Sequence, residues 1–192
     1  MSYRAYRVSN SNIILYIVAI NFVVFVATLV NQDLTYHLGL IPAEFLERPW
    51  TIVTSMFVHA GLWHIIANML TLYFLGSYLL RIAGPTALLV IYFLGGIAGS
   101  LLFVLLGPPS TIVVGASGAI FAVGGTLAMM RPQARVIVFP IPAPIPLWIA
   151  IIGGFVVLSF LPGVAWQAHL GGLILGLIAG YLLNRRAGRY RW

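Results

Sequence analysis

The sequence predicts an all-α polytopic membrane protein with six transmembrane helices, and three observations lead to this class. The 192 residues are 61% hydrophobic and only 7% charged, a composition too apolar for a soluble domain. Six apolar runs follow one another with short breaks, and a spanning helix needs roughly 20 apolar residues. With six spans, nine of the ten arginines fall on one side of the membrane. We therefore expect a single membrane domain over residues 1–192.

The breaks between the apolar runs set the expected span boundaries. The first run follows Arg4 and Arg7 and shows no small-residue cleavage pattern, so it is interpreted as an uncleaved span rather than a signal peptide. Later runs are bounded by the stretches "RIAGP" (81–85), "LGPPS" (106–110), "RPQAR" (131–135), "PIPAPIP" (140–146) and "LPG" (161–163). The expected spans are about 12–30, 62–81, 85–106, 116–130, 146–161 and 165–184.

The arginines orient these spans. Arg48 lies in the loop 31–61 together with every acid of the chain, which are Asp33, Glu44 and Glu47. The other nine lie on the opposite side: Arg4, Arg7, Arg81, Arg131, Arg135, Arg185, Arg186, Arg189 and Arg191. Positive residues mark the cytoplasmic side, so we expect a plasma-membrane protein with both termini in the cytoplasm. The net charge of +7 is then a topology signal and predicts no nucleic-acid partner.

The loop 31–61 is too apolar for a solvated loop and too broken for a span. We expect it to lie in the membrane interface or to enter the membrane partly, as a membrane-associated first loop. Tryptophans favour the two interfaces of a bilayer. Trp50, Trp63 and Trp166 are therefore expected near the outer interface, and Trp148 near the inner one.

Few polar residues fall within the expected spans, and intramembrane polar groups are costly enough to suggest function. Asn21 stands alone in the first span and is interpreted as a packing residue bonded to a neighbouring helix. His64 and Asn68 lie four apart in "HIIAN" (64–68) and share one helical face. Ser117 opens the fourth span and His169 lies near the start of the sixth. Since spans two, four and six all begin at the outer face, these last four residues share one side and roughly one depth.

Ser117 is expected below the outer surface of the membrane. The fourth span holds about 14 residues from Ser117 to Met130, which gives roughly 21 Å of helix against a hydrocarbon core of ~30 Å. Residues 107–116 must then descend as non-helical chain, which is tolerated only where it is buried or lines a water-filled cavity. Gly115 and Gly118 leave room for a substrate backbone. The N–H groups of a helix N-terminus favour an oxyanion beside the serine.

These residues predict a serine–histidine dyad. A serine hydroxyl needs a base to become a nucleophile, and His169 is best placed for that role. No carboxylate lies in any span, which disfavours a triad. His64, Asn68 and the Ser117 backbone N–H are expected to donate to the oxyanion. Phe121 is expected to pack on the imidazole of His169. Small residues at 172, 176 and 180 are expected to press the sixth span against the fourth.

Other interpretations compete with this one. A G-x-S-G pattern alone is most often a packing patch, and His64 and Asn68 could simply link two helices. A transporter or channel commonly places charges or broken helices at the midplane, whereas the ionisable groups here lie at the outer end and no inverted repeat is visible. A catalytic zinc is disfavoured, because the chain has no cysteine, no H-E-x-x-H motif and no intramembrane carboxylate. We expect neither a metal nor a cofactor.

The motifs "HIIAN" (64–68), "GASG" (115–118) and "AHLGGLILG" (168–176) resemble those of the rhomboid family of intramembrane serine proteases in order, spacing and placement. The resemblance runs from about residue 48 to residue 184. It implies a rhomboid-like six-helix bundle in which Ser117 is the nucleophile, His169 the general base, and His64 and Asn68 line the oxyanion hole, with Gly115, Gly118, Phe121 and Gly172 supporting the site.

The same resemblance implies single-span membrane proteins as substrates, cut near the outer face at small residues in helix-destabilised stretches. The fifth span and the cap after it resemble the family's substrate gate. Many members carry Trp-Arg in the first loop, whereas this chain has Trp50 followed by Thr51. A non-catalytic binding protein of the same fold, and a lipid esterase or acyltransferase, remain open alternatives.

Overall fold

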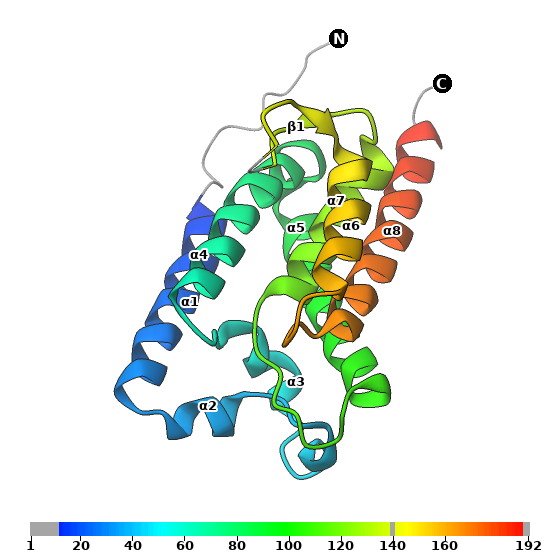
Figure 1. Cartoon of the computed structure of the whole chain (residues 1–192). Helices are drawn as coiled ribbons and strands as arrows, with labels where there is room; N and C mark the ends of the chain where they lie inside the picture. Colours follow the sequence, from blue (N-terminus) through cyan, green and yellow to red (C-terminus); the bar gives the residue numbers. More distant parts are fainter. Residues whose placement is uncertain (1–11, 139–140, 190–192) are drawn as a thin grey trace.

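The structure is a computed structural model that describes residues 12–138 and 141–189, and this part of the chain is mostly helical (Figure 1). The predicted helical class is thereby confirmed. The N-terminal arginines Arg4 and Arg7, and Arg191, lie outside the described residues. The main helices are α1 (Asn12–Val30), α4 (Leu62–Thr71), α5 (Ser77–Leu106), α6 (Ser117–Met130), α7 (Leu147–Ser159) and α8 (Trp166–Arg189).

The helices α4 and α5 belong to one long helical stretch with a single break. A π-helical turn η3 (Leu72–Gly76) joins them, and only Gly84 departs from helical geometry, with φ 84° and ψ 173° just before Pro85. Figure 1 draws the parts on either side of Gly84 as separate helices. The sequence predicted a wider break between residues 81 and 85. The break is narrower because proline is tolerated in a first helical turn, so the second part begins at once.

Three helical stretches of the described residues are long and apolar enough to cross a membrane, at 12–30, 62–106 and 166–185. The helices α6 and α7 are apolar but shorter. The 14 residues of α6 correspond to the short fourth span that the sequence predicted.

The core of the protein is the contact between α5, α6 and α8, where glycines replace larger side chains. Gly176 of α8 faces the backbone carbonyl of Ala122, and Gly180 faces that of Thr126, so closely that an added Cβ would collide with either. The Thr126 hydroxyl crosses this contact and donates to the Gly176 carbonyl at 3.0 Å. The predicted packing of the sixth span on the fourth is thereby confirmed. Helix positions without side chains allow such backbone contact in membrane proteins.

The helix α1 packs on the outside of this core through one face, whose buried members include Asn21. The Asn21 amide donates to the Ile17 carbonyl of its own helix at 2.8 Å. It is thus buried, as expected of a packing residue. Its Nδ2 bonds within α1 rather than to a neighbouring helix, and its Oδ1 has no hydrogen-bond partner among the described residues.

The helix α7 is only lightly attached. Leu147 is its one buried residue, and Cβ atoms added to Gly153 and Gly154 would meet no atom within 4 Å. Two backbone bonds hold its first turn: the Leu147 N–H donates to the Ala134 carbonyl at 2.7 Å, and the Trp148 N–H donates to the Pro132 carbonyl at 3.4 Å. These bonds connect α7 to a small antiparallel hairpin of β1 (Arg135–Val136) and β2 (Ile145–Pro146).

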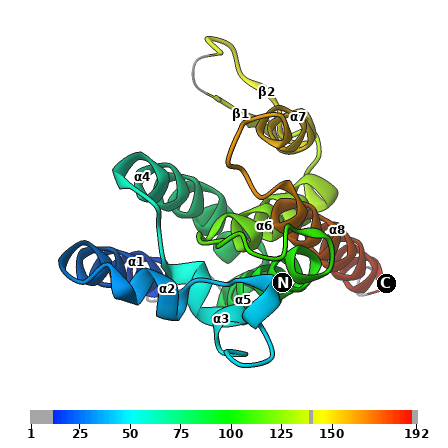
Figure 2. The same cartoon turned by 60° about the horizontal axis from the view of Figure 1, so that its bottom comes forward.

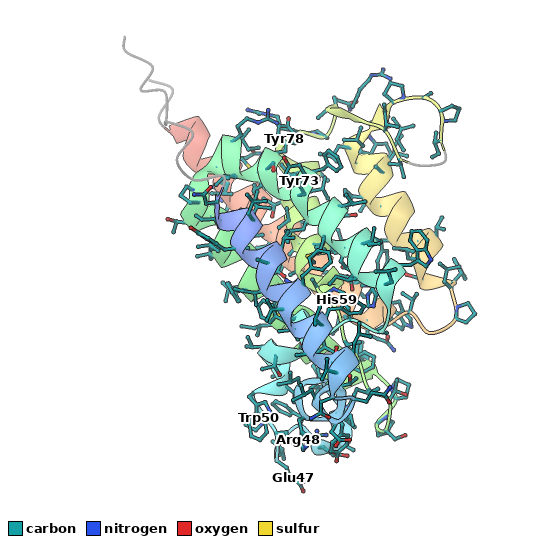
Figure 3. All side chains as sticks on the ribbon, turned by 90° about the vertical axis from the view of Figure 1, so that its left-hand side faces the viewer. Glu47, Arg48, Trp50, His59, Tyr73 and Tyr78 are labelled. Carbon is teal, nitrogen blue, oxygen red and sulfur yellow. The ribbon has the colours of Figure 1, made fainter. Side chains whose placement is uncertain are left out.

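The loop 31–61 is folded rather than extended. It forms the short elements α2 (Asp33–Leu38), η1 (Pro42–Glu44), α3 (Thr51–Thr54) and η2 (Ser55–Phe57). Arg48 ties them together by pairing with the Glu44 carboxylate, donating to the Tyr36 carbonyl and lying over the Tyr36 ring. Figure 3 places Glu47, Arg48 and Trp50 at the end of the molecule opposite Tyr78.

Candidate active site

Ser117 is the first residue of α6 and follows ten non-helical residues, 107–116. Three contacts fix this segment against the loop 31–61, and in the first of them the Ala43 N–H donates to the Pro109 carbonyl at 2.9 Å. Val113 and Leu40 exchange backbone hydrogen bonds of 2.8 and 3.0 Å, and the Gly115 N–H donates to the Ser55 carbonyl at 2.9 Å. Gly115 has φ +125°, a conformation that side chains disfavour. The serine is thus presented at a helix N-terminus by a segment whose path is set by hydrogen bonds.

His169 lies in the first turn of α8, is buried, and points at the serine. Its Nε2 is 2.8 Å from Ser117 Oγ, across 52 positions of sequence. Its Nδ1 is buried and has no hydrogen-bond partner among the described residues. When the neutral imidazole carries its hydrogen on Nδ1, Nε2 accepts the serine hydroxyl hydrogen. The arrangement is a serine with a base in hydrogen-bond reach.

In a catalytic triad a carboxylate orients the imidazole, whereas here an aromatic ring packs against it. The Phe121 ring lies 4.6 Å from the His169 ring, centroid to centroid, at an interplanar angle of 33°. Phe121 in turn meets Phe155 of α7 edge-on at 6.0 Å. The structure therefore brings Phe121 to the histidine, as expected from its position one turn after Ser117.

Backbone contact between α6 and α8 sets the distance between serine and histidine. Gly172 lies against the Gly118 carbonyl, and a Cβ added at Gly118 would lie 3.1 Å from the Ala168 carbonyl oxygen. These residues are direct chain neighbours or one turn away from Ser117 and His169. Larger residues here would separate the two helices, and Ser117 from His169 with them.

His64 borders the same space from the side of α4. A Cβ added to Gly115 would lie 2.8 Å from both Cε1 and Nε2 of His64 and 3.8 Å from Ser117 Oγ. The Ala60 N–H donates to His64 Nδ1 at 3.4 Å, which places the ring hydrogen on Nε2. The Nε2–H group of His64 and the Ser117 hydroxyl thus both lie next to Gly115.

Asn68 is placed differently. Its Nδ2 donates to the His64 carbonyl of its own helix at 2.9 Å, and the residue is buried. The spacing of His64 and Asn68 predicted a shared helical face, but it could not show that this amide is engaged with its own backbone.

His59 lies in the loop 31–61 and is a further buried histidine, outside the predicted site residues. It is 4% exposed, and its ring meets the His64 ring edge-on at 5.0 Å. Burial, and secondarily the neighbouring His64, lower the pKa of His59 to about 4, against a raising effect of the Phe57 carbonyl. Figure 3 shows His59 in the interior, at the foot of α4. The one sequence signal was its distance of five residues from His64.

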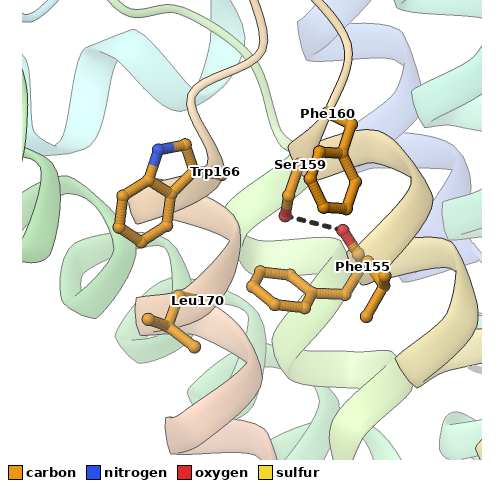
Figure 4. Close-up of a pocket in the computed structure, with 6 residues that line it drawn as sticks. Phe155, Ser159, Phe160, Trp166 and Leu170 are labelled. Carbon is orange, nitrogen blue, oxygen red and sulfur yellow. Dashed lines mark hydrogen bonds between the residues drawn. The ribbon is translucent and has the colours of Figure 1, made fainter.

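An apolar pocket of about 360 Å³ lies beside the site, between α7 and α8 (Figure 4). Ser159 lines it, and its hydroxyl donates to the Phe155 carbonyl at 2.7 Å, as the dashed line in Figure 4 shows. The lining residues are Phe155, Val156, Ser159, Phe160, Trp166 and Leu170. In the part of the chain that the structure describes, no three histidine, aspartate or glutamate residues gather into a possible metal site.

Comparison with known proteins adds a family to this geometry. A family model described as the Rhomboid domain matches residues 46–186. The chain is 29% identical to Rhomboid protein 1, mitochondrial, of Saccharomyces cerevisiae, over 79% of this chain and 47% of that protein. It is 30% identical to RHOMBOID-like protein 12, mitochondrial, of Arabidopsis thaliana, over 96% and 61% respectively.

A third relative carries a different description. The chain is 35% identical to Inactive RHOMBOID-like protein 8 of Arabidopsis thaliana, over 65% of this chain and 35% of that protein. The matches thus span between about a third and three fifths of the length of these curated relatives.

Proposed function

The chain belongs to the rhomboid family and is an integral membrane protein, and from this premise we propose that it is an intramembrane serine endopeptidase. The observation that carries the proposal is the 2.8 Å contact between Ser117 Oγ and His169 Nε2. Family membership alone does not decide activity, since one relative is named inactive. The dyad geometry is the feature that a hydrolase requires.

We propose that six segments span the membrane. Four of them are α1, α6, α7 and α8, and the other two are the parts of the helical stretch 62–106 before and after Gly84. The arginines then place both termini in the cytoplasm and the dyad toward the outer face. We propose the plasma membrane as its location. Two relatives are named mitochondrial, so fluorescent tagging and fractionation in the source cell is the measurement that decides this point.

The reaction follows from the contacts. Ser117 Oγ attacks the carbonyl carbon of the scissile peptide bond while the proton of the serine hydroxyl moves to His169 Nε2. Collapse of the tetrahedral intermediate breaks the C–N bond, and the leaving amine takes this proton from Nε2. Water then attacks the ester carbonyl on Ser117 and gives a proton to Nε2. The departing Ser117 Oγ takes this proton from Nε2, which restores the serine hydroxyl.

The oxyanion is held by donors at the α6 N-terminus. The backbone N–H of Ser117 and the Nε2–H of His64 border the space in front of the hydroxyl, and we assign them the main part in stabilising the developing charge. Asn68 is assigned a supporting part, because its amide holds the His64 carbonyl. The missing side chain at Gly115 leaves this space free for the substrate carbonyl.

We propose single-span membrane proteins as substrates, cut near the outer face where the substrate helix is destabilised. The lightly attached helix α7 fits the role of the element that moves to admit them, since it buries only Leu147. A lipid esterase would use the same dyad, and a purified substrate panel of membrane peptides and phospholipids separates the two.

The decisive experiment is covalent labelling by a serine-directed phosphonate, run beside cleavage of a tagged membrane substrate in proteoliposomes. Ser117→Ala is expected to abolish both, and His169→Ala is expected to abolish cleavage and labelling while the protein stays folded. Ser159→Ala is the matched control and is expected to retain both, because its hydroxyl is bonded to the Phe155 carbonyl. Normal cleavage by Ser117→Ala would overturn the proposal. Folded wild type that neither labels nor cleaves would support a non-catalytic binding protein instead.

A further inference from the structure

The segment that connects α6 to α7 carries side chains for which the proposed chemistry has no use. It comprises residues 131–138 and 141–146, and we refer to these residues as the α6–α7 hairpin. Its strands pair antiparallel, with Arg135 opposite Pro146 and Val136 opposite Ile145. Figure 2 shows this hairpin projecting away from the helices.

The hairpin combines exposed apolar and basic side chains. Ile137 is 75% exposed, and Val138 and Ile141 are 36% and 42% exposed. Arg131 and Arg135 are also exposed. No aspartate or glutamate occurs anywhere after Glu47, so neither arginine has an acidic partner at this end of the molecule.

Among the described residues, each of the two arginines uses only one of its N–H donors. Arg135 donates one N–H to the Pro144 carbonyl at 3.2 Å, and Arg131 donates one to the Met130 carbonyl at 3.3 Å. A guanidinium carries five N–H donors in a fork that suits phosphate. The hairpin therefore presents two phosphate-binding groups beside an apolar tip.

Pairs of aromatic and basic side chains lie at the end of the helices from which the hairpin projects. Arg81 lies over the Tyr78 ring at 5.5 Å, Arg185 lies over the Tyr181 ring at 5.6 Å, and Trp148 at the start of α7 is 45% exposed. Such residues gather at the membrane–water interface. Figure 1 shows β1 at the same end as the C-terminal end of α8. The hairpin thus begins at the level of lipid headgroups.

We propose that the α6–α7 hairpin is a docking surface for anionic phospholipid. Its apolar residues Ile137, Val138 and Ile141 insert among the upper acyl chains, while Arg131 and Arg135 bind headgroup phosphates. Charge complementarity selects this occupant, because an acid-free, basic and apolar surface at the cytoplasmic interface faces negatively charged lipid.

The hairpin is also the fixed end of α7. The Leu147 N–H is bonded to the Ala134 carbonyl, and Leu147 is the only buried residue of that helix. Lipid bound at Arg131 and Arg135 therefore anchors the N-terminal end of α7.

The test uses a single reporter, which the absence of native cysteine makes possible. Ile137→Cys carries an environment-sensitive fluorophore in the full chain, reconstituted in nanodiscs of equal parts phosphatidylcholine and phosphatidylglycerol. Trace nitroxide-labelled phosphatidylglycerol or phosphatidylcholine serves as quencher. We expect preferential quenching by the anionic lipid, by roughly five-fold per arginine. In the Arg131→Gln/Arg135→Gln background the two lipids are expected to quench equally, and Arg131→Lys/Arg135→Lys is expected to retain a preference.

Equal quenching by both lipids in the wild-type background would overturn recognition of the headgroup. Water-like emission without quenching by either lipid would overturn insertion and point to a soluble partner instead. An Ile141→Cys reporter repeats the measurement should the first variant fold poorly. None of these readouts involves peptide cleavage, so the hairpin proposal and the protease proposal stand or fall separately.

Discussion

Gly172 of α8 lies against the backbone carbonyl of Gly118 in α6 so closely that no side-chain carbon fits between them. Gly118 directly follows Ser117, and Gly172 lies one helical turn after His169. The contact therefore acts as a spacer of fixed length for the dyad. Every change in the separation of these two helices changes the distance between Oγ and Nε2, which is 2.8 Å.

Gly172→Ala is expected to lower activity and stability together. An overpacked helix contact costs typically about 1–3 kcal/mol, and misplacement of a catalytic base by 1 Å can cost about 10²-fold in rate. Cleavage kinetics and thermal unfolding in mild detergent measure both effects. Gly153→Ala in α7 is the control, since its Cβ meets no atom within 4 Å, and its unfolding temperature is expected to stay unchanged or rise. Equal behaviour of the two variants would contradict the spacer role of Gly172.

Phe121→Leu is expected to lower kcat with little change in KM. The phenylalanine ring packs on the His169 imidazole in a tilted arrangement, and aromatic pairs contribute about 0.5–1.5 kcal/mol beyond their area. Loss of this contact predicts a decrease of roughly two- to ten-fold in kcat. Phe121→Tyr keeps the ring and is expected to keep the activity. A leucine variant with wild-type kcat would show that the imidazole is oriented by other means.

His59 predicts a loss of stability in mild acid. Its pKa is about 4 in the folded protein and near 6.5 when exposed, so the unfolded chain binds more protons between these values. The free energy of unfolding therefore falls as the pH falls from 6.5 to 4, by on the order of 3 kcal/mol in total.

Unfolding experiments at pH 7 and pH 5 measure this change. His59→Gln is expected to lose part of the difference, because the other buried histidines, His64 and His169, remain, whereas the exposed His37→Gln is expected to keep all of it. A His59→Gln variant with the full pH dependence would assign the effect to another group.

His64→Ala is expected to be far more damaging than Asn68→Ala. Removal of one oxyanion donor costs about 10²–10³-fold in kcat, whereas the Asn68 amide bonds a backbone carbonyl and a single neutral bond is worth about 1 kcal/mol. Single-turnover rates of the two variants provide the comparison. Equal losses would mean that the Asn68 amide turns toward the substrate once it binds.

Ser117 and His169 could be predicted from the sequence because their positions follow from the number of spans and from the level at which each span begins. An even number of apolar runs, with arginines at alternate breaks, places three helix starts at one level. The spacing of small residues in α8 then shows which helices touch, and the structure confirms those contacts at Gly176 and Gly180. The roles of the dyad and of the oxyanion donors stay predictions until the variants are measured.

Other features could not be derived from the sequence, each for a physical reason. The direction of the Asn68 amide depends on a rotamer, which spacing does not fix. Burial of His59 results from the folding of a loop that has no periodic pattern. The strands of the α6–α7 hairpin hold two residues each, too few for an alternation of apolar and polar positions. The width of the break at Gly84 depended on a single left-handed residue.

The helix α7 buries fewer residues than α6 does, and we expect it to open as a separate cooperative unit. The glycine contacts of α5, α6 and α8 hold Ser117 and His169 together. The helix α7 is joined through Leu147 and two backbone bonds at its N-terminal end, and through the partly buried Ile151 and Phe155 further along. Opening of α7 therefore leaves the core helices paired, and its free energy is set locally rather than by global unfolding. Amide hydrogens in the second half of α7 are expected to exchange long before those of α6. If the proposed function is correct, α7 opens to admit each substrate while the helices that hold Ser117 and His169 stay packed.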